Sequence, residues 1–593
     1  MKIGAWRAAV AASAALAVVV AGCGSSSNEN SSSTPKAGSN TSSSGSSAKK
    51  GGDLKVLYAA DVDFMDPRQT YYQYGFLVAY ATQRPLYSYK PDDAKTPVPD
   101  LAESPPDISS DGKTVTVKIR SGVKFSPPVN RAVTSKDVKY ALESAFTKTV
   151  NGPYVGAYMG DLHGLQAFKD GKAKEITGIE TPDDQTIVFK LDRPRGAIVA
   201  GMLSMPASAP VPEEYAKKFD AENPSAYGKH VVATGPYMVQ NDAQGNLTGW
   251  KPNESIKLVR NPNWDAKTDY KPAYLDTITI QEGVDPQVAS RQILSGQGMA
   301  SGDFQIPAET LAQTSRNPAQ KAQLVLTPPT GRYRYISLNT RNKPFDNVNV
   351  RKAIAAAFDR NALRQAFGGP LTGDIPTHWI PPGQPGFDEA GGAQGPGDDF
   401  MAKPGGDMAL ATEYMKKAGY PSGKYTGGET FTAVSDSATQ QKNVGEVAQA
   451  QFAKLGFKVK TRYVVRNTMY TKFCQVPKNE PDICPSVGWL KDFADPEAEL
   501  GPVFNGKNIL DVSNSNFSLL DDKALNAQMD KAEVVNDPTQ RLQAWGDVDK
   551  TITGLAPGVA WLWDKQPMLE SKNVNGVVNV ANASWDLTFS SLK

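Results

Sequence analysis

Histidine, cysteine and long apolar runs are all scarce in this chain. Three histidines and three cysteines stand among 593 residues, and the histidines lie far apart in the sequence. No G-x-S-x-G, H-E-x-x-H, Walker or dinucleotide-binding motif occurs, so we expect no enzyme, no metal site and no cofactor. Charge is balanced as well, with 64 basic against 62 acidic residues. We therefore expect no nucleic-acid partner.

The first apolar run is too short to span a membrane. Residues 8–20 are apolar apart from Ser13 and follow a start that carries Lys2 and Arg7, whereas a membrane helix needs ~20 apolar residues. The run ends in Val20-Ala21-Gly22-Cys23, a pattern typical of a bacterial lipobox. We predict a lipoprotein signal peptide over 1–22 and a lipidated Cys23. An ordinary signal peptide followed by an incidental cysteine is the alternative.

A polar segment follows Cys23. Residues 24–52 are mostly Ser, Gly, Asn and Thr, and such a composition cannot bury enough apolar surface to fold. We predict a disordered tether over 23–52 that holds a folded, monomeric body at the outer face of the cytoplasmic membrane, or in a periplasm. In an oxidising compartment the remaining cysteines, Cys474 and Cys484, predict a disulfide, with two free thiols as the alternative.

The body alternates strand and helix patterns. Strand signals occur around residues 115–119, 278–280 and 457–465. Thr134, with Asp137 three residues on, can cap a helix over the following apolar stripe. Similar stripes recur over 350–358 and 444–455. The sequence therefore predicts mixed α/β lobes.

Several sequence blocks, taken in order, resemble one family. They are Asp66-Pro67, Pro99 to Ser104, Asp111 to Thr114, Gly122 to Phe125, Val133 to Val138, Ala233 to Tyr237, Arg260 to Trp264, Leu338 to Thr340, Pro344 to Asp346, Val350 to Arg360, Gly488 to Asp492, Asp495-Pro496 and Ala556-Pro557. Together they resemble the bacterial extracellular solute-binding proteins of family 5, which include oligopeptide, dipeptide and nickel binders. The resemblance covers nearly the whole mature chain.

This resemblance implies an α/β periplasmic-binding-protein-like fold of class II, cluster C type. It has two lobes joined by a two-strand hinge, with an extra domain in the first lobe. We expect the hinge at Leu324–Thr327 and around Ala556-Pro557. The implied division is lobe I over 53–83, 213–327 and 559–593, the extra domain over 84–212, and lobe II over 328–558.

The resemblance also implies ligand-binding residues. In peptide-binding members the aspartate of the Gly-Trp-x-x-Asp block binds the peptide ammonium, and the matching residue here is Asp492. Gly488 and Trp489 belong to the same block, Trp489 as an apolar wall, and Asp61 matches a cleft-lining acid of some members. Structural roles for Asp492 and Trp489 remain open. Arg332 and Arg334, near the hinge, are candidates for a ligand carboxylate.

The expected function is to capture a small ligand, an oligopeptide or dipeptide, and deliver it to the permease subunits of an ABC importer. A nickel chelate, an oligosaccharide or an opine is an alternative ligand within the family. A secreted hydrolase on a similar scaffold is a second class, which the missing catalytic motifs disfavour.

Overall fold

The structure is a computed structural model that describes residues 48–329, 331–579, 581–582 and 584–593. The signal peptide, Cys23 and almost all of the predicted tether lie outside the described residues. In the part of the chain that is described, no helix combines the length and apolar character that crossing a bilayer requires.

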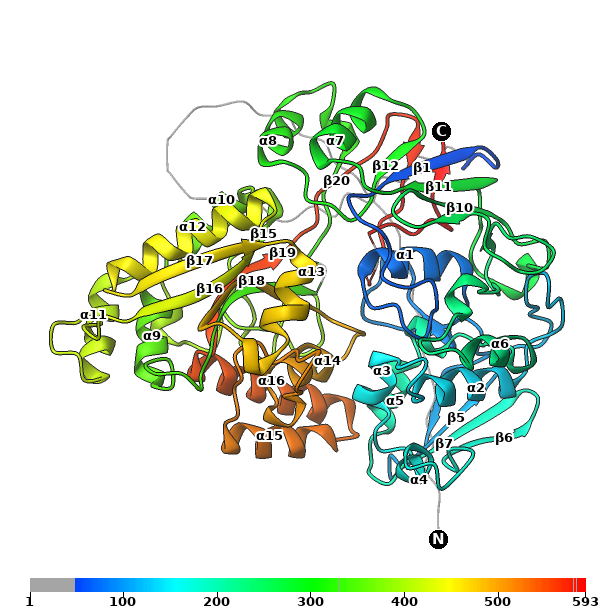
Figure 1. The fold of residues 1–593 in the computed structure, drawn as a ribbon, viewed down its shortest axis with the longest axis horizontal. Helices are drawn as coiled ribbons and strands as arrows, with labels where there is room; N and C mark the ends of the chain where they lie inside the picture. Colours follow the sequence, from blue (N-terminus) through cyan, green and yellow to red (C-terminus); the bar gives the residue numbers. More distant parts are fainter. Residues whose placement is uncertain (1–47, 330, 580, 583) are drawn as a thin grey trace, which may run out of the picture. The chain divides into compact units, whose positions relative to one another are not determined.

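One lobe is built on a mixed sheet that the chain visits repeatedly. β1 (Asp53–Leu57) lies in it with parallel neighbours on both sides, and its Leu54 and Val56 are buried. The other strands of this sheet are β8 (Tyr237–Val239), β9 (Trp250–Lys251), β10 (Ser255–Arg260), β11 (Thr277–Gln281) and β12 (Met299–Ser301). We call this part of the molecule the first lobe. Figure 1 shows the blue strand β1 between the green strands β12 and β11, with β10 beyond β11.

A separate antiparallel sheet of four strands lies within residues 107–190. Its strands are β4 (Asp107–Ile108), β5 (Thr114–Lys118), β6 (Ile179–Asp183) and β7 (Thr186–Lys190). Helix α2 (Ser135–Ala145) begins after Thr134, whose backbone N–H donates to Asp137 at 2.7 Å. The predicted cap and helix are confirmed, and the buried face of α2 belongs to the first lobe's core.

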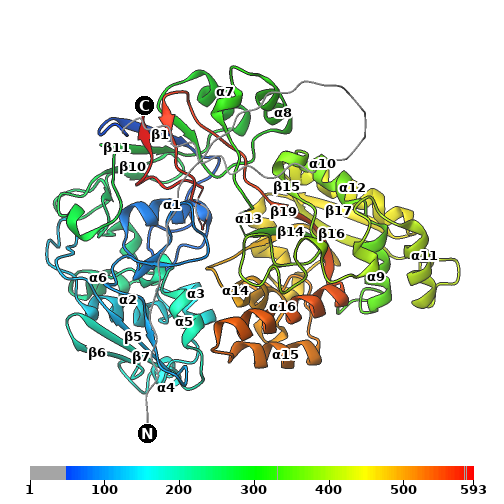
Figure 2. The same ribbon diagram turned by 180° about the vertical axis from the view of Figure 1, so that it is seen from behind.

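The second lobe is built on a six-stranded sheet. Its strand order is β15 (Gly373–Asp374), β19 (Gly558–Asp564), β14 (Arg332–Leu338), β18 (Ile483–Leu490), β16 (Thr430–Asp436) and β17 (Lys458–Val464). The two stripes predicted to be helical form α9 (Val348–Ala357) and α12 (Thr439–Lys454). In Figure 2, which shows the molecule from behind, α9 and α11 (Met408–Lys417) lie side by side, with α9 nearer to this sheet.

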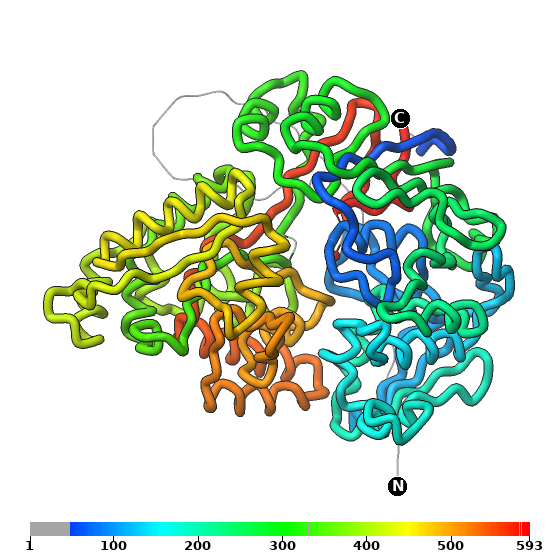
Figure 3. Tube along the Cα trace, viewed as in Figure 1, coloured from blue at the N-terminus to red at the C-terminus, as the bar shows by residue number. Residues whose placement is uncertain are grey.

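Two chain segments connect the lobes, and they run side by side. β13 (Leu324–Val325) pairs antiparallel with β20 (Met568–Leu569), and the backbone N–H of Gln566 donates to the Thr327 hydroxyl at 2.9 Å. Figure 3 shows the green and red tubes together at this crossing. Bending at two adjacent strands lets such lobes open and close about a hinge.

One predicted boundary is wrong. We expected the chain to leave lobe II at Gly558, with the second hinge strand near Ala556-Pro557. Instead β19 (Gly558–Asp564) is hydrogen-bonded to β14 and β15 in the middle of the second lobe. The return to the first lobe therefore comes after Asp564, because the sheet ladder holds the preceding residues. The other divisions, including the extra domain over 84–212, remain a proposed division.

Candidate ligand-binding site

Most of the predicted ligand-binding residues lie on β18 and the segment that follows it. β18 is a central strand, antiparallel to β14 on one side and parallel to β16 on the other. Gly488 stands opposite Arg334 in this ladder, and a Cβ there would lie 2.7 Å from the Tyr333 carbonyl oxygen. Glycine at this position is thus required by the close approach of two strands.

Trp489 is held by its polar edge and covered by an aromatic ring. Its Nε1–H donates to the Ala498 carbonyl at 2.8 Å, and only 6% of the residue is exposed. The Tyr71 ring lies 6.4 Å from the Trp489 ring, and the Tyr154 ring lies 4.8 Å from the Tyr71 ring. Since Tyr71 and Tyr154 come from the first lobe, the two lobes meet here through aromatic side chains.

Asp492 lies buried at the same meeting point. Its side chain accepts a hydrogen bond from the hydroxyl of Tyr158, at the end of α3 (Pro153–Tyr158), and its backbone carbonyl accepts one from Asn582. Within the described residues, Tyr158 is the only side chain that hydrogen-bonds to this carboxylate. Burial raises the pKa of Asp492 to about 7, and the Tyr158 hydrogen bond acts in the opposite direction.

The neighbouring Lys491 points elsewhere. Its ammonium donates to the Ala581 carbonyl at 2.9 Å, and burial lowers the pKa of Lys491 to about 8. Within the residues that the structure describes, no ion pair joins the Asp492 carboxylate to a basic side chain. The Asp492 carboxylate thus keeps its negative charge only at a cost, because burial penalises the charged form.

Asp61 occupies a different environment. Its carboxylate accepts hydrogen bonds from the backbone N–H of Val62 at 2.7 Å and of Asn253 at 2.8 Å. It also raises the pKa of Glu282, which burial and this neighbouring carboxyl bring to about 8. Among the described residues, no hydrogen bond or ion pair joins Asp61 to the segment that carries Asp492. The contacts of Asp61 and those of Asp492 thus involve different residues.

The two arginines near the hinge have protein partners. Arg334 Nε donates to Asp564 at 2.8 Å, and Arg332 Nη2 donates to Gln73 of the first lobe at 3.0 Å. Sequence reasoning missed a third arginine. Arg466 donates from Nε to Asp436 at 3.2 Å, yet 52% of its side chain is exposed. Its position just after β17 carried no motif that would have identified it.

The sequence matches a known protein family over most of its length. A family model for bacterial extracellular solute-binding proteins, family 5 (middle region) matches residues 96–511. The chain belongs to this family.

Relatives of this family-5 solute-binding protein are found among both sequences and structures. It is 26% identical to the glutathione-binding protein GsiB of Salmonella paratyphi A over 79% of this chain and 81% of the relative. The clavulanic acid biosynthesis oligopeptide binding protein 2 has a TM-score of 0.78 and 26% identity, over 92% and 96% of the two chains. The Helicobacter pylori ABC transporter-associated periplasmic binding protein DppA, in complex with peptide STSA, has a TM-score of 0.72 and 23% identity, over 92% and 98%.

These comparisons support the two-lobe α/β fold, and family and fold are both those of binding proteins. The chain is thus an extracytoplasmic solute-binding protein, homologous to proteins of ABC importers that bind small peptide-like solutes.

A disulfide stabilises the second-lobe side of the site. Cys474, at the end of the short π-helical turn η8 (Tyr470–Cys474), is bonded to Cys484 of β18, and both cysteines are buried. The bond ties the segment that bears Arg466 and Tyr470 to the strand that bears Trp489. In this solute-binding protein the arrangement places one buried carboxylate beside aromatic rings, a combination that chemically suits a cationic group attached to an apolar body.

Proposed function

We propose that this protein binds a short peptide between its lobes, with the peptide's ammonium group against Asp492. The observation that carries the proposal is the buried carboxylate, whose single side-chain partner within the described residues is the neutral Tyr158 hydroxyl. A buried charge without a counter-charge costs several kcal/mol. A ligand ammonium would supply that counter-charge, whereas a neutral sugar would not.

The aromatic side chains support the same ligand class. Tyr71 and Tyr154 from the first lobe and Trp489 from the second lie next to one another beside the acid. Such rings can contact the apolar part of a peptide and interact favourably with its ammonium through their π faces. The relative GsiB is named for glutathione, itself a small peptide-like molecule with a free ammonium group, so glutathione belongs in the ligand panel.

We also propose that the protein delivers its ligand to a permease and is attached to the membrane by a lipid. A family-5 binding protein presents its ligand to the permease subunits of an ABC importer, and the sequence supports attachment by a lipid on Cys23 through the Ser- and Gly-rich tether over 24–52. We propose a monomer, because one chain contains both lobes and both hinge strands.

The test is isothermal titration calorimetry with trialanine, glutathione and N-acetyl-trialanine. Asp492→Asn keeps the shape but removes the charge, and losing one partner of a buried charged pair costs about 2–5 kcal/mol. We expect the affinity for trialanine or glutathione to fall by roughly thirty-fold or more at neutral pH.

Two controls make the test specific. N-acetylation removes the same charge from the ligand side, so it should weaken binding to the parent protein and have little further effect on Asp492→Asn. Asp170→Asn, an equally conservative change at a surface acid of the first lobe that pairs with Lys172, should leave the affinity unchanged. Equal affinity of parent and Asp492→Asn for the free peptides would contradict the proposal.

A further inference from the structure

The segment that follows Asp492 crosses into the first lobe. Phe493 is fully buried within the first lobe's core, with its ring 4.8 Å from the Tyr158 ring. A Cβ at Gly201 would lie 2.6 Å from the Phe493 ring, so the two surfaces fit closely. The next residue, Ala494, donates its backbone N–H to the Tyr89 hydroxyl at 3.0 Å. Three consecutive residues of the second lobe are thus held by the first.

A buried ion pair joins the two lobes a few residues after this segment. Glu497, in the first turn of α14 (Pro496–Phe504), accepts from Arg195 Nη2 at 2.6 Å through one oxygen and from Arg541 Nη2 at 2.7 Å through the other. Arg195 precedes α5 (Gly196–Met202) in the first lobe, whereas Arg541 lies on α16 (Pro538–Leu555) in the second. The side chains of Arg195, Glu497 and Arg541 are only 6%, 6% and 5% exposed.

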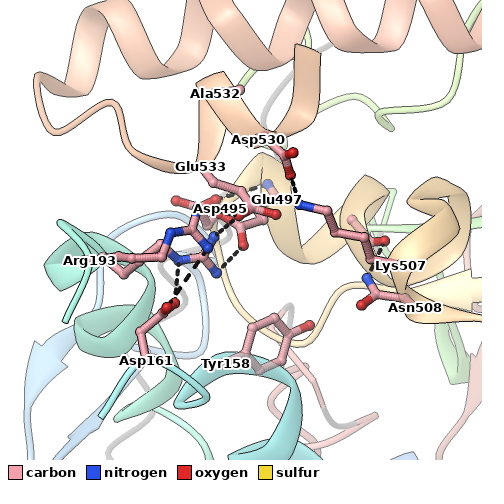
Figure 4. A network of polar contacts seen from close by, with 12 residues as sticks. Tyr158, Asp161, Arg193, Asp495, Glu497, Lys507, Asn508, Asp530, Ala532 and Glu533 are labelled. Atoms are coloured by element: carbon pink, nitrogen blue, oxygen red, sulfur yellow. Dashed lines mark hydrogen bonds and ion pairs between the residues drawn. The ribbon is translucent and has the colours of Figure 1, made fainter. Parts of the chain in front are cut away.

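A second acid extends the contact. Glu533, the last residue of α15 (Lys523–Glu533), accepts from Arg193 Nη2 at 3.0 Å and lies 2.7 Å from Arg195 Nη1, an ion-pair contact whose angle does not make a hydrogen bond. Asp161 approaches Arg195 Nε at 3.6 Å from within the first lobe. Figure 4 shows Asp161 and Arg193 meeting Asp495, Glu497 and Glu533, with Tyr158 close by.

The face of each lobe at this contact carries a net charge opposite to that of the other. We call the charged residues of both faces the lobe clasp. It comprises Asp161, Arg193 and Arg195 of the first lobe and Asp495, Glu497, Glu533 and Arg541 of the second. The first-lobe face has two guanidinium groups against one carboxylate, and the second has three carboxylates against one guanidinium. The faces therefore attract each other, and the attraction is screened less than at a surface because the central side chains are buried.

Residues of the clasp lie on the same two chain segments as Asp492 and its partner Tyr158. Tyr158, which donates to Asp492, stands three residues before Asp161 of the clasp. On the other side, Asp492 stands five residues before Glu497 in the same short connection to α14. A movement of the whole first-lobe face away from Glu497 therefore also moves Tyr158 away from Asp492.

We propose that Arg195 and Glu497 are positioning residues that hold the Asp492 carboxylate in place and bias the lobes toward closure. This inference rests on the proposed function for the role of Asp492, but the closure itself needs no particular ligand. On opening, Glu497 keeps its partner Arg541, whereas Glu533 loses both Arg193 and Arg195 and its carboxylate turns to solvent. Because each carboxylate then has either a cation or water beside it, the clasp can open and close reversibly.

Hydrogen–deuterium exchange tests the proposal on the purified full-length protein with no peptide added. The reporter is the backbone amide of Ala494, in peptides that cover 492–497, because its acceptor is a side chain of the opposite lobe. Arg195→Gln should shift the population toward the open form and raise the exchange rate there by at least about tenfold. Glu533→Gln should raise it by a smaller factor, because Arg195 keeps Glu497.

Two further variants separate positioning from a general loss of structure. Arg131→Gln removes an arginine that joins Asp137 and Glu214 inside the first lobe, so it should leave exchange over 492–497 unchanged. Arg195→Lys keeps the charge and should restore most of the protection. If Arg195→Gln loses cooperative unfolding, Glu533→Gln alone decides the outcome.

If exchange in both Arg195→Gln and Glu533→Gln is as slow as in the parent, the proposal that the clasp biases the lobes toward closure is wrong. The readout contains no ligand, so failure of the peptide hypothesis would leave it unaffected. Conversely, a confirmed clasp together with an unchanged affinity in Asp492→Asn would refute only the proposed function.

Discussion

Asp492→Asn should make the unliganded protein more stable at neutral pH while it weakens ligand binding. Asp492 is 5% exposed, and burial raises the pKa of its carboxyl from an ordinary value of 3.8 to about 7. An acid whose pKa is higher in the folded state binds more protons when folded than when unfolded. The stability that it contributes is therefore lost as the pH rises from about 4 to about 7.

The magnitude follows from the size of that shift. Each pKa unit corresponds to about 1.4 kcal/mol, so above pH 7 the ionised Asp492 destabilises the fold by roughly 2–4 kcal/mol. Asparagine is neutral at every pH and can still accept the hydrogen bond from Tyr158. We expect Asp492→Asn to unfold at a temperature about 2–4 °C higher than the parent at pH 8, with the difference vanishing near pH 4.

Differential scanning calorimetry of the unliganded protein between pH 4 and pH 8 measures this difference. Tyr158→Phe is the matched variant, because it removes the hydroxyl that lowers the Asp492 pKa and should therefore extend the pH-dependent loss of stability to higher pH. A parent and an Asp492→Asn variant with parallel stability curves across this range would refute the assignment of a buried, charge-penalised carboxylate.

The remaining predictions concern anchoring and covalent structure. Cys23→Ala should move the protein from the membrane fraction to the soluble fraction on fractionated cells, because the tether has no other apolar anchor; unchanged membrane association would exclude lipidation at this residue. Peptide mapping without reductant should recover Cys474 linked to Cys484, and the Cys474→Ala, Cys484→Ala double variant should lose roughly 2–3 kcal/mol of stability in denaturant titrations. Quantitative alkylation of both cysteines without reductant would show that the bond does not form.

Local sequence patterns predicted much of the secondary structure. The capped helix after Thr134 and the strand over 458–464 are where the residue patterns placed them. These elements depend on contacts between near neighbours, namely capping hydrogen bonds and apolar side chains at fixed spacing. The boundary at Gly558 was wrong because β19 belongs to the second lobe through pairing with β14, some 220 residues earlier in the chain, and no local pattern encodes that pairing.

The same difference between local and distant contacts applies to the candidate site. A short block of sequence identified Trp489 and Asp492, because they lie within four residues of one another and resemble a family pattern. It did not identify Tyr71, Tyr154 or Tyr158, whose rings reach the block from segments more than three hundred residues away.

By itself, the sequence determined the family, the alternation of strands and helices, and the two cysteines available for pairing. It also pointed to one acid for the ligand ammonium. Only the tertiary structure decided that this acid is buried against a neutral tyrosine, that Asp61 contacts Asn253, and that Arg195 reaches Glu497. The physical reason is that burial and ion pairing depend on which distant segments meet, and that is set by the packing of two lobes and not by neighbours in sequence.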